Sequence, residues 1–174
     1  MRLRPGELEF VLAQGLPAVV EVRGASMTPA IAVGDRLNIQ PTPAAGDDIA
    51  VGDIVVIIAT DAAELLTHRV MHLFTEQGRR FVVHQGDMTG ARFAICPREL
   101  VIGKAVAFDA QPARPLPTVA HLGASERARF RRRAAVAVWY CRARGAARAL
   151  GVHDRKLTRA AARLYRKLSG ALGR

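Results

Sequence analysis

A serine at position 26 is the residue whose neighbours point most clearly to chemistry. It lies in VRGASMTPAI, residues 22–31, where glycine, methionine and proline surround it directly after an apolar, β-branched run. A serine hydroxyl is a poor nucleophile unless a base takes its proton and backbone N–H groups stabilise the oxyanion that forms. A tight loop after a strand can supply those donors, but such a loop is also typical of an ordinary turn. Ser26 is therefore a candidate nucleophile that needs a partner base.

Histidine and lysine are the candidate bases. The chain has three lysines, and Lys104 alone precedes the basic C-terminal region. His68, in ELLTHRVMHLF, is better placed, because an imidazole with a pKa near 6.5 accepts a proton at neutral pH. His72 is a rival on the same strand face, and since four residues span about 13 Å of strand, only one of the two can face Ser26. His84 is a weaker third candidate, and each histidine could instead be a half-buried strand residue.

Charge is divided unevenly along the chain. Residues 1–110 contain 10 Lys and Arg against 13 Asp and Glu, whereas residues 111–174 contain 16 against 2. The stretch DAQPARPLPTVAHLGAS, with three prolines and a glycine, is typical of a linker. We therefore predict a catalytic β domain over 1–108, a linker over 109–125 and a basic helical tail over 126–174.

The first part of the chain is predicted to be mainly β. A short helix in PGELEFVLAQG is followed by runs of Val, Ile and Leu of strand length. The predicted strands are residues 18–23, 36–41, 53–59, 65–74, 79–85 and 99–108. Turns are expected where Gly can take positive φ and Asp can accept hydrogen bonds from neighbouring backbone N–H groups. These turns are Gly34-Asp35, Gly52-Asp53 and Gly86-Asp87.

Two basic helices are predicted in the tail. They are SERARFRRRAAVAVWYCRARGAARAL, with Ser125 as N-cap, and DRKLTRAAARLYRKLSGAL, with Asp154 as N-cap. Arginines flank an apolar stretch with Trp139 and Tyr140, which favours an amphipathic helix at an anionic membrane surface. The same charge attracts nucleic acid, although no recognised nucleic-acid-binding motif is present. A solvated basic face whose apolar side packs on the β domain or on a partner is the third interpretation.

Six short motifs follow one another between about residues 18 and 108. They are GASMTP, GDRLNI, VGDIVVI, THRV, HQGD and VIGKAV. In their order and spacing they resemble the type I signal peptidase superfamily of serine endopeptidases, which also includes self-cleaving repressor domains. The resemblance implies a complex β-fold of short strands and coiled sheets, with Ser26 as nucleophile. The H-R-V box resembles the endoplasmic-reticulum-like branch of the family, which implies His68 as the base.

Asp87 is the candidate third member of the site. In the histidine branch, an aspartate in or shortly after the G-D box orients the histidine, as a buried carboxylate does in other triads. Asp87 matches the first aspartate of that box, but the second acidic position, about six residues later, is Phe93 here. This departure leaves Asp87 as the one nearby carboxylate. A weakened or inactive catalytic site therefore remains an alternative. The alternative is a turn residue like Asp35 and Asp53.

No cofactor or metal is predicted. Cys96 and Cys141 lie far apart and match no metal-ligand or redox spacing, which favours free thiols in a reducing compartment. The first 22 residues lack the continuous apolar region of a signal peptide, and the longest later apolar run, AAVAVWYC, is far shorter than the roughly 20 residues that a bilayer needs. We therefore expect a cytoplasmic protein, peripheral at the membrane at most, rather than an anchored signal peptidase.

Three functional hypotheses follow from these patterns. The first is a serine endopeptidase of signal-peptidase type that cleaves a precursor or leader segment with a Ser-His(-Asp) site. The second is a catalytically inactive or self-cleaving regulator that uses the basic tail to bind nucleic acid or membrane. The third is an interaction module that has the peptidase fold only.

Overall fold

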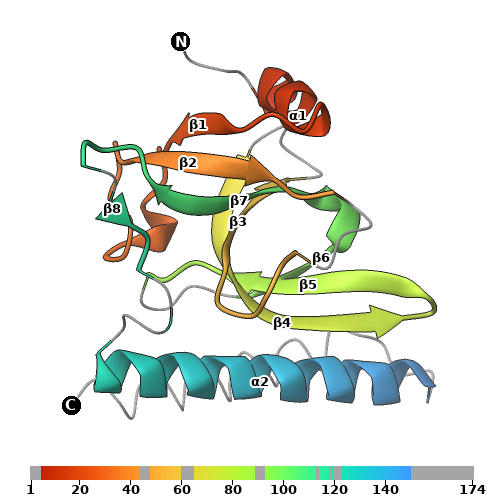
Figure 1. Cartoon of the computed structure of the whole chain (residues 1–174). Coiled ribbons are helices and arrows are strands. Elements are labelled where there is room, and N and C mark those ends of the chain that lie inside the picture. Colours follow the sequence, from red (N-terminus) through yellow and green to blue (C-terminus); the bar gives the residue numbers. More distant parts are fainter. Residues whose placement is uncertain are drawn as a thin grey trace. The chain divides into compact units, whose positions relative to one another are not determined.

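An antiparallel sheet makes up most of the first part of the chain (Figure 1). The computed structural model describes residues 5–43, 48–59, 65–88, 93–112, 114–117, 119 and 123–149. The chain divides into two units, Met1–Thr118 and Val119–Arg174. Within the described residues the sheet has eight strands, and a helix follows it in the second unit. The predicted class, mainly β with a C-terminal helix, is therefore confirmed.

The strands pair in the order β1-β2-β7-β3-β4-β5-β6, with β8 added beside β7. They are β1 (Ala18–Glu21), β2 (Arg36–Pro41), β3 (Ile54–Ile58), β4 (Leu65–Glu76), β5 (Arg79–Gln85), β6 (Ala94–Pro97), β7 (Val101–Phe108) and β8 (Arg114–Pro115). The helices are α1 (Pro5–Ala13) and α2 (Ala124–Ala149), with two short 3-10 helices, η1 (Ala25–Met27) and η2 (Arg98–Leu100). Figure 1 shows that the sheet curls and that β4 and β5 form a long hairpin.

Strands β6 and β8 lie outside the predicted set. Strand β6 has four residues and a proline, and it pairs only with β5, at an edge of the sheet where a missing N–H is tolerated. Strand β8 lies inside the predicted linker. Its Arg114 guanidinium lies 3.9 Å from the centre of the Phe108 ring, and the following Leu116 is buried in the core. The first unit therefore continues past residue 108, where the β domain was predicted to end.

Two Gly-Asp turns have the predicted conformation. They occur in a tetrapeptide, AVGD, that is present twice, at residues 32–35 and 50–53. The φ angles of the two glycines are 91° and 101°, and each aspartate accepts a hydrogen bond from the backbone N–H three residues earlier. The first turn exchanges two backbone hydrogen bonds with Val22, and the second does the same with Val70. These turns therefore hold the chain four residues before Ser26 and two residues after His68.

Two apolar clusters lie on opposite faces of β3. Ile54 and Val56 belong to a cluster with Met27, whereas Val55 and Ile57 belong to a cluster with residues of β4, β5 and β7. A strand that is buried on both faces is expected to be a continuous apolar run, and β3 has the sequence IVVII. Met27 is fully buried, so burial of this side chain holds η1, and with it Ser26, against the sheet.

Helix α2 starts one residue before the predicted N-cap. The carbonyl of Gly123 accepts the first helical hydrogen bond, from the N–H of Arg127, and the Glu126 carboxylate accepts a hydrogen bond from the N–H of Gly123. The N-cap is therefore Gly123, and the prediction of Ser125 was wrong by two positions, because Glu126 supplies the side-chain half of the cap. The second predicted tail helix, with Asp154, lies outside the described residues.

Candidate active site

Ser26 lies half-exposed in the 3-10 helix η1, between β1 and β2. The helix is anchored by its last residue, Met27, whose side chain is fully buried and whose carbonyl accepts a hydrogen bond from the N–H of Ile31. The carbonyl of Ser26 accepts a hydrogen bond of 2.9 Å from the N–H of Met88. The backbone of Ser26 is therefore held by a hydrogen bond and by the burial of the adjacent Met27.

Gly86 allows the close approach of Ser26 to the end of β5. A Cβ at Gly86 would lie 2.4 Å from the carbonyl oxygen of Ser26 and 3.1 Å from its Cβ. The predicted positive φ is not found at this glycine, which is needed for space rather than for a left-handed conformation. Any larger residue at position 86 would displace the candidate nucleophile.

The β4–β5 register, extended by one step, places His68 opposite the glycine on which Ser26 packs. Arg69 pairs with Gln85, so one further step of the antiparallel register places His68 opposite Gly86. Residues opposite each other share a face, with Cβ atoms about 5 Å apart. Helix η1, which covers Gly86, also contacts β4. No hydrogen bond joins the Ser26 hydroxyl to His68 among the described residues, which is common in catalytic sites before substrate binds.

A β-bulge separates the two histidines of β4. The register shifts between Val70 and His72, so His68 and Val70 share the face of His84, whereas His72 shares the face of Val83. His72 stacks on Phe74, with ring centres 6.2 Å apart. The prediction that His72 lies on the same face as His68 was wrong, because the bulge adds one residue to the strand alternation.

His68 contacts a second histidine directly. Its Nδ1 lies 2.9 Å from Nδ1 of His84, and the ring centres are 5.1 Å apart. Burial lowers the pKa of His68, and the negative charge of Asp87 opposes that change. Burial, together with the neighbouring His68, lowers the pKa of His84 to about 4. Both imidazoles are therefore neutral at pH 7, which a general base requires.

Asp87 is held by Arg69. The Arg69 Nε lies 3.0 Å from Oδ1 of Asp87, and an Arg69 terminal nitrogen lies 2.6 Å from Oδ2. Another terminal nitrogen of Arg69 donates to the carbonyl of Gly52. Strand alternation explains the pairing: His68 and Arg69 are consecutive and point to opposite faces, and Asp87 lies with Arg69. Asp87 thus differs from the turn residues Asp35 and Asp53, and it influences His68 through its charge rather than through a hydrogen bond.

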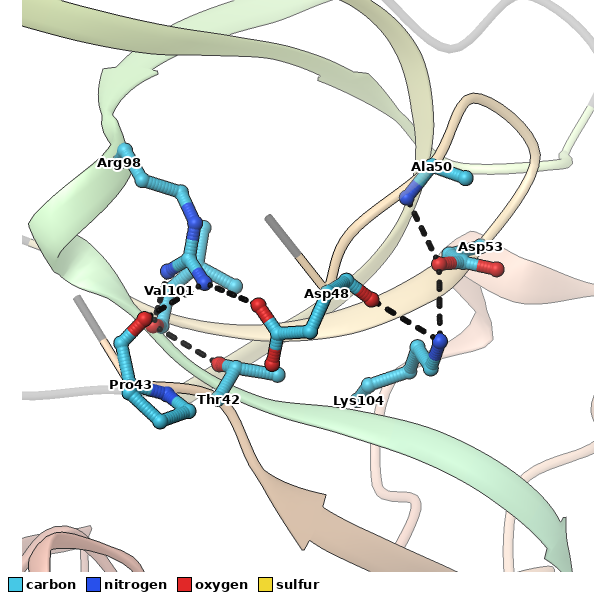
Figure 2. A network of polar contacts seen from close by, with 8 residues as sticks. All are labelled: Thr42, Pro43, Asp48, Ala50, Asp53, Arg98, Val101 and Lys104. Atoms are coloured by element: carbon cyan, nitrogen blue, oxygen red, sulfur yellow. Dashed lines mark hydrogen bonds and ion pairs between the residues drawn. The ribbon is translucent and has the colours of Figure 1, made fainter. Parts of the chain in front are cut away.

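Lys104, the one lysine considered as an alternative base, belongs to another network (Figure 2). Its Nζ donates to the carbonyl of Asp48 at 3.0 Å and pairs with the Asp53 carboxylate at 3.2 Å. Val55 pairs with Lys104 on one side and with His68 on the other, so two strand spacings, about 10 Å, separate the lysine and histidine backbones. The lysine amine therefore fastens the loop around residues 48–53.

Arg98 completes that network from the side of η2. Its side chain is buried, and it donates to the carbonyls of Val101 and Pro43 and to the carboxylate of Asp48 (Figure 2). These contacts tie the end of β2 to the start of β7. None of these contacts involves Ser26 or His68.

The other predictions concern metals, thiols and membrane spans. Among the residues that the structure describes, no three His, Cys, Asp or Glu side chains gather as a metal site would need. Cys96 is buried with its pKa raised to about 12, Cys141 is half-buried, and both are free thiols. Of the helical segments described, none has the length and apolar character that crossing a bilayer takes.

Comparisons with protein-family models, curated proteins and solved structures gave no match. The function proposed below therefore rests on the six motifs and on the geometry of the site. The sequence reasoning missed two contacts of that site, the His68–His84 pair and the Arg69–Asp87 pair. The His68–His84 contact could have been suspected from the spacing of His84 and Gly86. These two residues are two positions apart and therefore share a strand face, and Gly86 lies opposite His68.

Proposed function

We propose that the chain is a serine endopeptidase of signal-peptidase type, with Ser26 as nucleophile and His68 as general base. The observation that carries the proposal is the packing of Ser26 on Gly86, the position opposite His68 in the strand register. The substrate class is a peptide or protein segment, and the reaction needs no cofactor. Asp87 is assigned to the site as the carboxylate that pairs with the buried Arg69 and acts on His68 through its charge.

The chemistry follows from the free nitrogen of His68. Its Nδ1 is occupied by His84, so Nε2 is the atom that takes the proton as the Ser26 Oγ attacks the scissile carbonyl. The same nitrogen then gives the proton to the leaving amine as the peptide bond breaks. Water, deprotonated by Nε2, hydrolyses the acyl-enzyme and regenerates the serine. Met88, 45% exposed and bonded through its N–H to Ser26, offers an apolar surface beside the reacting atoms.

The test is to find cleavage products without choosing a substrate in advance. Peptides prepared from a cell lysate are incubated with the protein, and new N-termini are identified by mass spectrometry. New termini with a shared sequence around the cut, absent with Ser26→Ala protein, support the proposal. An identical set of termini with both proteins contradicts it and favours the catalytically inactive regulator or interaction module.

The pH dependence of cleavage should distinguish the base. Protonated His68 cannot accept the serine proton, and burial lowers the pKa of His68 from its ordinary value of 6.5. We therefore expect kcat/KM to be constant around pH 7 and to fall about tenfold per pH unit below a midpoint that lies under 6.5. The measurement is the initial rate of product formation across the pH range. A rate that rises only above about pH 8 would indicate a lysine base instead.

We also propose that the tail binds an anionic membrane surface, which would make the protein peripheral at the cytoplasmic face. The described helix α2 contains eight arginines and one glutamate. Trp139 is 42% exposed, and exposed arginines, Arg132 and Arg142, share its side of the helix by their spacing of seven and three residues. Basic residues and an exposed indole are the combination that interfacial helices use.

The tail prediction is tested by co-sedimentation of the full-length protein. We expect binding to anionic vesicles that persists at about 200 mM salt, because burial of Trp139 is not screened by salt, and much weaker binding to neutral vesicles. Trp139→Ala should weaken the vesicle binding that persists at high salt, whereas Arg142→Ala should weaken mainly the vesicle binding at low salt. Retention at about 200 mM salt on duplex DNA but not on vesicles would favour nucleic acid, because binding by charge alone falls steeply with salt.

A further inference from the structure

The His68–His84 contact limits where protons can lie. Two imidazole Nδ1 atoms 2.9 Å apart form a hydrogen bond only if one of them carries a proton and the other has a free lone pair. If His84 donates, neutral His68 carries its own proton on Nε2 and cannot take one from serine. If His68 donates, its Nε2 is free. Only the second arrangement is competent for base catalysis.

We propose that His84 is the positioning residue of this site: it accepts the hydrogen bond from Nδ1–H of His68 and so holds His68 with Nε2 free to face Ser26. The proposal deepens the proposed peptidase function and rests on it. It gives His84 the place that the resemblance assigns to an aspartate, because the only aspartate nearby among the described residues, Asp87, is bound by Arg69.

The surroundings of His84 suit an acceptor. The residue is 3% exposed, and Val70 lies opposite it in the strand register. Val82, on the same face, belongs to a buried apolar cluster. Burial keeps the ring neutral at pH 7, so Nδ1 retains a lone pair, and packing fixes the ring in one orientation. A mobile side chain, or a protonated imidazolium without a lone pair, could not select this tautomer of His68.

In the part of the chain that the structure describes, the charged and titratable groups around the pair are few. In the strand register, Val55 of β3 lies opposite His68, and Ala94 of β6 lies opposite His84. Beyond them lie Lys104, which is held by Asp53, and Cys96, whose thiol stays neutral because its pKa is raised to about 12. Among the described residues, the remaining charges are Arg69 and its partner Asp87, whose negative charge opposes the lowering of the His68 pKa by burial. The acid side of the pH profile should therefore report the histidine pair.

Three variants of His84 test the role. His84→Leu removes the acceptor and should lower kcat by about 10²- to 10⁴-fold with little change in KM, as removal of an orienting group does elsewhere. His84→Asn keeps an oxygen near the place of Nδ1 and should restore kcat to within about tenfold. His84→Asp supplies a charged acceptor and should move the acid midpoint of kcat/KM to higher pH, a change that a merely structural role would not produce.

His72→Leu is the matched control, because it removes a half-buried histidine from the opposite face of the hairpin. We expect it to change neither kcat nor the acid midpoint. If His84→Leu, folded by circular dichroism, cleaves like the wild type in a reaction that still depends on Ser26, the inference fails while the peptidase function stands.

A second readout does not depend on activity. Long-range proton–nitrogen NMR spectra distinguish the two neutral tautomers of a histidine. We expect His68 of the full-length protein to carry its proton on Nδ1, and to change to the Nε2–H form in His84→Leu but not in His84→Asn. An Nε2–H tautomer of His68 in the wild type would overturn the inference, whether or not cleavage is found.

Discussion

Ser26→Ala is expected to abolish cleavage and to leave the fold intact. Loss of the nucleophile in serine hydrolases lowers kcat by about 10⁴- to 10⁶-fold, and a residual rate remains because substrate is still bound and polarised. The folded state should tolerate the change because Ser26 contacts Gly86 and Met88 through its backbone atoms and Cβ, which alanine keeps. The measurement is kcat for a peptide found in the search for new termini, together with the thermal unfolding temperature.

Two controls make the Ser26 result specific. Ser125→Ala removes an exposed serine from α2 and should have no effect on kcat. His68→Ala should lower kcat by a similar factor to Ser26→Ala, and the double variant should be no slower than either single variant, because the two residues act as one unit. Cleavage by Ser26→Ala at more than about a tenth of the wild-type rate would mean that another group attacks the peptide.

Arg69→Met is expected to destabilise the first unit by about 3 to 5 kcal/mol. The Arg69 side chain is 2% exposed, and it joins β4 to two segments, through the Asp87 carboxylate and through the carbonyl of Gly52. Its loss leaves the partly buried Asp87 carboxylate and the buried Gly52 carbonyl without their donor, so their desolvation is no longer compensated. The measurement is the free energy of unfolding from urea titration.

A surface ion pair provides the comparison. Arg36 and Asp109 form a contact of 3.0 Å, but their side chains are 60% and 34% exposed, so Arg36→Met should cost less than about 1 kcal/mol. Asp87→Asn should also be costly, because Arg69 then remains charged and buried. The double variant Arg69→Met, Asp87→Asn should recover part of the loss, since neither charge is left unpaired. Equal effects of Arg69→Met and Arg36→Met would show that the buried pair is not a structural contact of the site.

The rate of cleavage should also fall when the Arg69–Asp87 pair is broken. Asp87 is followed by Met88, whose N–H binds the carbonyl of Ser26. Release of Asp87 from Arg69 therefore loosens the segment against which the nucleophile packs. Even a folded Asp87→Asn protein is expected to lose activity, through position as well as through the lost charge beside His68.

Local patterns were sufficient for most of the sheet. The run IVVII predicted β3 because a strand buried on both faces needs apolar residues at every position. The two AVGD turns were predictable because glycine and aspartate act there within four residues of one another. The roles of Ser26, His68 and Asp87 stay predictions, and the strand register places His68 opposite Gly86, on which Ser26 packs. In the strand and the turns, the deciding interactions join residues close in sequence or follow the two-residue alternation of side chains along a strand.

Contacts between distant segments were decided by the tertiary structure alone. One extra residue between Val70 and His72 reverses the face of every later side chain in β4, and no composition signal marks such a bulge. Asp87 and His84 are three residues apart in sequence, yet the first binds Arg69 and the second binds His68. Which histidine or carboxylate reaches His68 depends on how β4 and β5 align, a choice made by packing of both sheet faces. The sequence alone therefore determined which residues could do chemistry, and the strand register determined which of them meet, because hydrogen-bond partners are set by distance in space.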